Sequence, residues 1–487
     1  MNRILTFLIL CVLSLDVPAQ ETDKDIGSLA DLWATYHESR EFDKCLDVAL
    51  EMYDITKDES ETNFMSIAFL ARSYFFLEDY NKSLSLGLES LEIIRKLNPT
   101  DEEEELYKNQ FLLSILNNNA ESYRFLGDYN QSLEINLELV QVSKKIYSKE
   151  NLFTLVSLSN LALSYSKLGL YKESLEINFE CLDLREKILG KEHPDYILSL
   201  NNIAAIYQDL GDYNKALDMY IECCKIGERI YSKDNLNFLT LLSNLSTAYA
   251  DVGNYQKALE ISLDVVSSSK KYNLDSLPSF TQALNNLALV YLHLEDYNKS
   301  VELLLECINL NQNLGFEKYH IRNQDIIANI NLVYYETNDY EESLNLLLEL
   351  LSYQKDSFDK EDLRIGETFS LLAHTNFQLG NLNEAYNYFS KYQKISLSYY
   401  KNRERFLNNN LVYNLHSTEV LNFNNLFNFL NSVSDNRVSD TVKEIYNIFC
   451  FLKGRELSKN NAISSNIYKS KDDELIKLYQ DWIDINK

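Results

Sequence analysis

An aromatic residue recurs along most of this chain at intervals close to 42 residues, and this period constrains the fold more than any other feature. The recurring residues are Phe42, Tyr80, Tyr129, Tyr171, Tyr213, Tyr255, Tyr297 and Tyr340, with Leu382 at the last position. From Tyr129 to Tyr297 every interval is 42 residues. A period of this length predicts a structure built from one repeated supersecondary unit.

The stretch Asn202–Leu217, NIAAIYQDLGDYNKAL, shows the unit most clearly. Ile203 and Tyr207 are spaced as on one face of a helix. Gly211 can adopt the positive φ that ends a helix, and Ala216 begins a second apolar face. The unit is therefore predicted to be a helix, a tight turn and a second helix.

At two other positions of the unit, nearly every repeat has the same type of residue. A tyrosine stands six residues before the turn aromatic, except that Asn376 takes its place in the last unit. A small residue stands three residues after it: Cys45, Ser83, Ser132, Ser174, Ala216, Ala258, Ser300, Ser343 and Ala385. A small side chain lets two helices approach, and the tyrosines fill their crossing. We predict an all-α fold, an α-solenoid of about nine two-helix units.

The array changes at its ends. The interval from Tyr80 to Tyr129 is 49 residues and contains the acidic run Asp101–Glu105, which predicts either a longer solvated loop or an extra helical turn. The period disappears after about residue 401. Later stretches with a helical pattern are Leu411–Leu430, Val442–Leu457 and Lys471–Ile485. We expect a solenoid over residues 20–402 and a helical extension over residues 403–487.

Residues 1–19 have the composition of a secretory signal peptide. Arg3 supplies the positive start, Ile4–Leu15 is an apolar run of suitable length, and Ala19 offers a small-residue cleavage site. The run is shorter than the roughly 20 apolar residues of a membrane-spanning helix. The residue before Cys11 is not small, which argues against a lipoprotein site. We predict export to the periplasm or the cell exterior, without membrane insertion after cleavage.

The net charge of the chain and the positions of its cysteines exclude some classes of function and of structure. The net charge of −27 argues against binding to nucleic acid or to an anionic membrane, because both need a basic surface. Cys181, Cys223 and Cys307 each follow a turn tyrosine by ten residues, and Cys45 takes the place of the small residue. At these positions two helices pass closely, so we expect small buried side chains and not disulfides.

The spacing N-x-A-x-x-Y-x-x-x-G-D-Y-x-x-A resembles the tetratricopeptide repeat (TPR). The joining segment Gly190–Asp195, GKEHPD, is similar to the 42-residue kinesin light chain type of this repeat. The resemblance covers about Asp31–Tyr400. It implies a right-handed superhelix whose concave groove binds peptides or other proteins.

A second resemblance lies in the C-terminal part. Phe451–Leu457 (FLKGREL), Asp472–Leu475 (DDEL) and Tyr479–Trp482 (YQDW) are similar to the region that joins TPR arrays to CHAT domains, which are caspase-like peptidase domains. The family's catalytic His and Cys lie beyond this junction, and Cys450 matches no motif. The resemblance implies that the chain is the TPR half of such a protein, or a version without the peptidase.

The sequence contains no arrangement that indicates catalysis or cofactor binding. It has no G-x-x-x-x-G-K-[ST] or G-x-G-x-x-G phosphate loop, and no H-E-x-x-H or C-x-x-C metal pair. The six histidines fall at different positions of the repeat, which is typical of surface or packing residues. We expect no enzyme activity, no cofactor and no metal.

One polar residue recurs in register. An asparagine stands eleven residues before the turn aromatic in six units: Asn118, Asn160, Asn202, Asn244, Asn286 and Asn329. Asparagine is a poor residue for a helix interior, so six in register need a reason. In the TPR family this position borders the groove, where an amide can pair with the backbone of an extended peptide. The alternative, compatible with the first, is that each asparagine bridges adjacent repeats.

The predicted ligand follows from the charges near these asparagines. Lys167 is followed by Asp209, Asp251 and Glu336 at the same position of the repeat, so a basic or neutral segment fits better than a C-terminal carboxylate. The leading hypothesis is an exported protein-interaction scaffold that binds a peptide or protein partner. The alternative is the regulatory half of a CHAT peptidase whose catalytic domain is absent from this chain. The sequence leaves the oligomeric state open.

Overall fold

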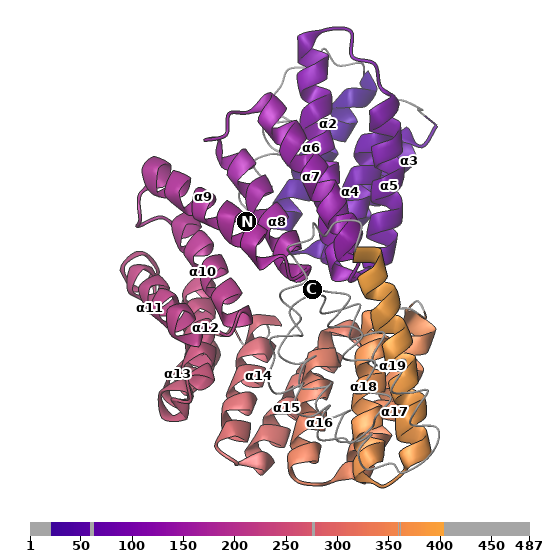
Figure 1. Ribbon diagram of the computed structural model, residues 1–487. Helices are drawn as coiled ribbons and strands as arrows, with labels where there is room; N and C mark the ends of the chain where they lie inside the picture. The colour runs from indigo at the N-terminus through magenta and orange to yellow at the C-terminus, as the bar shows by residue number, and fades with distance from the viewer. Residues whose placement is uncertain (1–20, 59–62, 275–277, 359, 361, 404–487) are drawn as a thin grey trace, which may run out of the picture. The chain divides into compact units, whose positions relative to one another are not determined.

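The computed structural model describes residues 21–58, 63–274, 278–358, 360 and 362–403. Within these residues the chain forms 18 α-helices and one short 3-10 helix, η1 (Ile321–Asn323), and contains no strand. Figure 1 shows that successive helices are antiparallel neighbours. The prediction of an all-α fold of about nine helical hairpins is confirmed.

Each hairpin consists of a first helix, here the A helix, and a second, the B helix. The A helices are α2 (Glu21–Glu38), α4 (Asn63–Phe76), α6 (Glu102–Phe125), α8 (Leu152–Lys167), α10 (Pro194–Asp209), α12 (Leu236–Asp251), α14 (Pro278–His293), α16 (Gln324–Glu336) and α18 (Leu363–Gln378). The B helices are α3 (Phe42–Thr56), α5 (Tyr80–Lys96), α7 (Tyr129–Ile146), α9 (Tyr171–Leu189), α11 (Tyr213–Ile230), α13 (Tyr255–Lys271), α15 (Tyr297–Asn313), α17 (Tyr340–Ser357) and α19 (Leu382–Arg403).

The chain divides into two compact units, and the boundary falls inside α10. Unit 1 is Met1–Ile203 and unit 2 is Ala204–Lys487. The predicted signal peptide and the three predicted helices after residue 404 lie outside the described residues, so the domain limits at 19 and 402 stay predictions. Among the described helices, none combines the length and the apolar composition needed to cross a membrane.

One turn geometry separates the A and B helices in every hairpin. The residue two before the turn aromatic has positive φ throughout; in the hairpin of α10 and α11 it is Gly211, with φ 76°. Next to it, Asp212 caps α11 by accepting a hydrogen bond from the backbone N–H of Lys215. Where glycine is absent, Glu295 adopts the same conformation with φ 61°. The turn predicted from Gly211 is therefore general, and the backbone geometry is kept without glycine.

The small residue three after the turn aromatic closes the crossing of the two helices. Ser174 Oγ donates a hydrogen bond to the backbone oxygen of Ala162, 2.6 Å away, and Ser300 makes the equivalent bond in its own hairpin. Cys45 takes the same place, with its Sγ 3.7 Å from the backbone oxygen of Trp33. The hydroxyl or thiol satisfies a buried carbonyl while it keeps the helices close.

The cysteines predicted to be small buried residues are indeed buried, and none of them forms a disulfide in the described residues. Cys45, Cys181, Cys223 and Cys307 have no exposed surface, and Cys224 is also buried and unpaired. Burial raises the pKa of the Cys307 and Cys224 thiols to about 12. These thiols are therefore protonated and unreactive at neutral pH.

The long interval between Tyr80 and Tyr129 contains extra helical turns. Helix α6 has 24 residues, and its first turn includes the glutamates of the acidic run. Asp101 caps the helix by accepting a hydrogen bond from the backbone N–H of Glu104, 2.8 Å away. Negative side chains are favourable at a helix N-terminus, so the acidic run extends the helix instead of forming a loop.

Candidate functional site

The A helices α12, α14 and α16 of unit 2 lie closer to one another than the B helices of this unit do. Helix α14 contacts both α12 and α16, whereas successive B helices of this unit lack comparable backbone proximity. In a stack of hairpins the helices on the inner side of the curve are the ones that converge. The A helices therefore form the inner side of this unit.

One stripe of each of these A helices stays accessible. Its residues stand 15, 11, 8 and 4 positions before the turn aromatic, a spacing that places them on one helix face. We call this surface the A-face. It consists of Thr240, Asn244, Thr247 and Asp251 on α12; Gln282, Asn286, Leu289 and His293 on α14; Asp325, Asn329, Leu332 and Glu336 on α16; and Glu367, Leu371, His374 and Gln378 on α18. Residues at positions 10, 9 and 7 before the turn aromatic are buried in all four helices, so the stripe has sharp edges.

The asparagine ladder runs along the middle of the A-face, and part of it bridges neighbouring repeats. Asn329 Nδ2 donates to Asn285 Oδ1, 2.9 Å away on the preceding A helix. In unit 1, Asn160 Nδ2 donates to Asn117 Oδ1 over 2.7 Å in the same way. Both residues are half-buried. The bridging role predicted as an alternative is thus present at Asn160 and Asn329.

Asn202, Asn244 and Asn286 are also half-buried and keep some accessible surface. The Asn286 Oδ1 accepts a hydrogen bond from Gln282 Nε2 one turn earlier, at 2.8 Å. These three side chains stand on successive A helices, α10, α12 and α14. Asn202 belongs to unit 1, so Asn244 and Asn286 are the ladder residues of unit 2 best placed to meet a ligand.

Asn118 departs from the expected groove position, because its side chain is only 5% exposed. Its Oδ1 accepts a hydrogen bond from Arg72 at 3.1 Å, and its Nδ2 donates to Ser83 at 3.2 Å. Arg72 also pairs with Glu121 at 2.9 Å, and both of these side chains are largely covered. Asn118 therefore belongs to a buried polar cluster between two repeats and has little surface to offer a peptide. Sequence reasoning missed this cluster, because Arg72 and Glu121 stand in different repeats.

The A-face carries carboxylates and no lysine or arginine. Asp251 accepts a hydrogen bond from Gln208 at 2.6 Å, and burial raises the pKa of its carboxyl group. Glu367 is accessible to solvent, yet desolvation by the surrounding protein, together with the charges of Asp325 and Asp362, raises its pKa to about 7. Nearby Arg364 is engaged by Asp362, with Nε 2.9 Å from Oδ1. The negative charge of this face is thus not balanced by basic residues of the face itself.

The A-face carries two histidines in different surroundings. His293 stacks on the ring of Tyr255, with centroids 5.0 Å apart. Burial lowers the pKa of His374, whose Nδ1 lies 2.8 Å from the backbone oxygen of Ser370. His374 is therefore neutral at pH 7. Asp325 and Glu367 were absent from the expected site; their position, four residues before the ladder, would have revealed them from helical spacing.

The described residues contain no group of three or more histidines, cysteines or acidic side chains arranged to hold a metal ion. What the A-face presents is amides, hydroxyls, carboxylates and leucines such as Leu332, which is 41% exposed. These groups suit recognition of a polypeptide.

Comparison with known families identifies the repeat. One tetratricopeptide repeat model matches residues 111–187, 157–229 and 196–271, and another matches residues 281–314. The chain therefore contains tetratricopeptide repeats, and the resemblance to this repeat is confirmed. Repeats of this kind commonly form protein-interaction scaffolds. No curated protein matches the sequence significantly.

Solved structures with a similar architecture are repeat proteins. A putative kinesin light chain with nearly identical TPR-like repeats from Podosopora anserina has 23% identity and a TM-score of 0.36, covering 42% of this chain and 96% of its own. BtubC from P. vanneervenii has 17% identity and a TM-score of 0.38, with coverages of 52% and 93%. The apo form of the quorum sensor NprR from B. thuringiensis has 18% identity and a TM-score of 0.47, with coverages of 77% and 100%. These are similarities of architecture at low identity, and we take no function from them.

Proposed function

We propose that this protein is a non-enzymatic scaffold that holds a peptide or protein segment along the A-face of unit 2. The observation that supports this most is the row of asparagines, which keeps accessible amides on successive A helices while the residues beside them are buried. An asparagine amide both donates and accepts hydrogen bonds, so a row of them can pair with the backbone of an extended segment. Exposed Leu332 provides an apolar contact beside the row.

The ladder serves two roles in this proposal. Asn160 and Asn329 join adjacent repeats through amide-to-amide hydrogen bonds. Asn244 and Asn286 make the contacts with the partner. The division explains why the same residue type is used in structurally different surroundings.

The test replaces Asn244 and Asn286 together by alanine in the full chain. We expect weaker capture of partners from extracts of the native cell, with unchanged helical content, because alanine is a better helix former than asparagine. The matched control replaces Asn214 and Asn298 by alanine. These asparagines are exposed at the start of B helices. Equal capture by both double variants would refute the assignment of the A-face.

Export is part of the proposal and rests on residues 1–19. We expect the mature chain recovered from the native cell to begin at Gln20, outside the cytoplasm, as terminal sequencing of the purified protein will show. A mature chain that retains Met1 or Asn2 would refute export.

The alternative function is that of a regulatory half of a CHAT peptidase, and it is favoured by the motif at Phe451–Leu457. These residues lie outside the described part of the chain. The discriminating observation is the DNA downstream of the codon for Lys487. A reading frame with a His/Cys peptidase domain favours the alternative, and its absence leaves the scaffold function alone.

A further inference from the structure

We infer that the segment held on the A-face is cationic, an extended peptide with lysine or arginine side chains that contact Asp251, Asp325, Glu336 and Glu367. This inference rests on the proposed function and specifies the chemistry of the partner. It follows from the charge of the A-face, its accessible residues and the arrangement of its carboxylates in two rows.

The two rows lie on either side of the asparagine ladder. Asp325 and Glu367 stand four residues before the ladder position on α16 and α18, and Asp251 and Glu336 stand seven residues after it on α12 and α16. With a rise of about 1.5 Å per residue, the rows are roughly 16 Å apart along a helix. A segment that crosses the helices along the ladder therefore has carboxylates on both sides of its backbone, within reach of long basic side chains.

The first row, Asp325 and Glu367, brings together two carboxyl groups that repel each other. Asp325 and Glu367 occupy the same position of adjacent repeats, and their mutual repulsion contributes to the raised pKa of Glu367. In the part of the chain that the structure describes, no lysine or arginine forms an ion pair with either residue. A guanidinium or ammonium group placed there would replace repulsion by attraction.

Elsewhere on unit 2, several acidic residues are paired with lysines. Lys257 lies 2.8 Å from Glu260, and Lys299 lies 3.0 Å from Asp296. Both pairs are on or beside B helices. The A-face has no lysine or arginine to pair with its carboxylates, so its negative charge is complementary to a basic ligand. The charged side chains of the B helices form an ordinary solvated surface.

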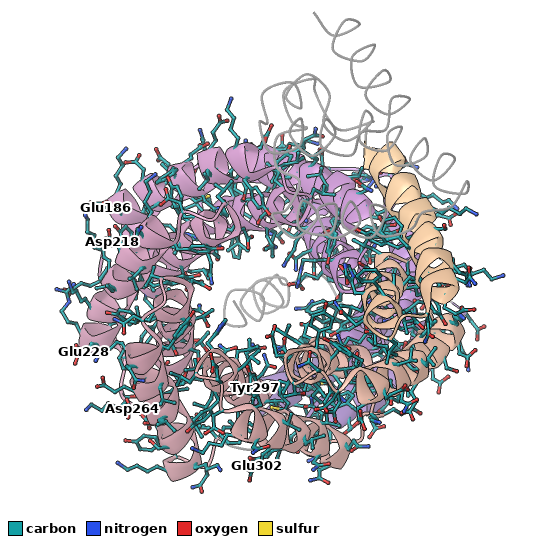
Figure 2. The ribbon with its side chains drawn as sticks, turned by 60° about the horizontal axis from the view of Figure 1, so that its bottom comes forward. Glu186, Asp218, Glu228, Asp264, Tyr297 and Glu302 are labelled. Carbon is teal, nitrogen blue, oxygen red and sulfur yellow. The ribbon has the colours of Figure 1, made fainter. Side chains whose placement is uncertain are left out.

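The B helices provide a control of equal charge. Figure 2 shows the side chains of Asp218, Asp264 and Glu302 directed outward from α11, α13 and α15. All three are exposed. At pH 8, where the Glu367 carboxyl group is largely ionised, replacing Asp218 and Asp264 by asparagine changes the net charge by nearly as much as replacing Asp325 and Glu367 by their amides.

The experiment measures fluorescence anisotropy of labelled peptides with the full chain. The peptides are equal-length alternations of serine with lysine, glutamine or glutamate. We expect the lysine peptide to bind best, and Asp325→Asn with Glu367→Gln to weaken it about fivefold or more, while Asp218→Asn with Asp264→Asn changes it less than about twofold. Circular dichroism verifies that both double variants are folded.

The pH dependence gives a second readout. The groups whose charges act on Glu367 are Asp325 on α16, together with Asp362 and Arg364 at the start of α18. Because the Glu367 carboxyl group loses its proton near pH 7, affinity for the lysine peptide should rise from about pH 6 to about pH 8. The single variant Glu367→Gln should remove most of this rise.

Three results would overturn the inference. One is an equal loss of affinity in both double variants, which would mean that net charge alone attracts the peptide. Another is a preference for the glutamine or glutamate peptide that depends on Asn244 and Asn286; the proposed function would then stand without the cationic ligand. The third is no binding of any peptide, as expected if residues 404–487 or a second copy of the chain covers the A-face. In that case, the proposed function would stand if partner capture still depended on the asparagines. If capture did not depend on them, both the proposed function and the cationic ligand would be refuted.

Discussion

Gly87 and Asn119 form a complementary pair whose disruption can be followed quantitatively. Gly87 lies in α5, and a methyl group added there would overlap Oδ1 of Asn119 in α6 and lie 2.9 Å from its Cγ. Asn119 is completely buried, and neither Oδ1 nor Nδ2 has a hydrogen-bond partner in the described residues. The amide therefore occupies space that glycine leaves empty, and the surrounding protein prevents it from moving into solvent.

The expected magnitude follows from this geometry. Overpacking of a buried site costs about 1–3 kcal/mol, so we expect Gly87→Ala to lower the free energy of unfolding of the N-terminal repeats by about 2 kcal/mol. Asn119→Ala removes a buried unpartnered amide, which offsets the cavity that it leaves, so we expect a change within about 1 kcal/mol. The double variant should be more stable than the sum of the single effects by about 2 kcal/mol.

The assay is urea unfolding of the full chain, followed by far-UV circular dichroism and by the fluorescence of Trp33. Trp33 is 1% exposed and its Nε1 donates a hydrogen bond to Ser73 at 2.8 Å, so it reports on the first repeats. Trp482→Phe in every variant removes the second tryptophan of the sequence.

Gly27→Ala is the control, because a methyl group at Gly27 meets no atom within 4 Å. We expect this variant to be as stable as the parent or slightly more stable, since alanine favours a helix. If Gly87→Ala behaves like Gly27→Ala, or if Asn119→Ala fails to relieve it, the packing argument is wrong.

Three further predictions concern the turn, a buried ion pair and the thiols. Glu295→Gly should stabilise its hairpin by about 0.5–1 kcal/mol, because the cost of a positive φ exceeds the entropy lost with glycine; urea unfolding that shows a loss would contradict this. Arg72→Leu should destabilise unit 1 by about 3 kcal/mol, because it leaves the Glu121 carboxylate buried without its cation, and adding Glu121→Leu should restore most of the loss in the same assay. Cys307 should resist a thiol reagent at pH 8 in the folded protein and react after unfolding, as peptide mass spectrometry will show, because burial raises its pKa to about 12.

The sequence was sufficient to predict the helical hairpins, because their signals are local and repeated. The position of Gly211, the small residue typified by Ser174, and the buried Cys307 all follow from the period alone. Repetition strengthened each signal, since one helix–turn–helix could be fortuitous and nine in register could not. The prediction of the binding site depended on residues that recur less regularly along the chain.

Side-chain contacts between repeats could not be predicted in this way. The burial of Asn118 depends on Arg72, which stands 46 residues earlier and reaches across from the preceding A helix. Asn119 occupies a place where the next repeats have Leu161 and Ile203, and only the neighbouring Gly87 makes room for it. Such contacts depend on the offset between successive hairpins, which the period does not specify.

The central claim is that the A-face of unit 2 binds the partner, and photocrosslinking tests it most directly. A photoreactive phenylalanine is placed at Leu332 on the A-face or at Leu263 on B helix α13; the two leucines are 41% and 43% exposed. The full chain carrying either one is mixed with the labelled lysine peptide and irradiated. We predict strong labelling from position 332, competed by unlabelled peptide, and little from position 263. Equal labelling from both positions, or stronger labelling from position 263, would contradict the claim.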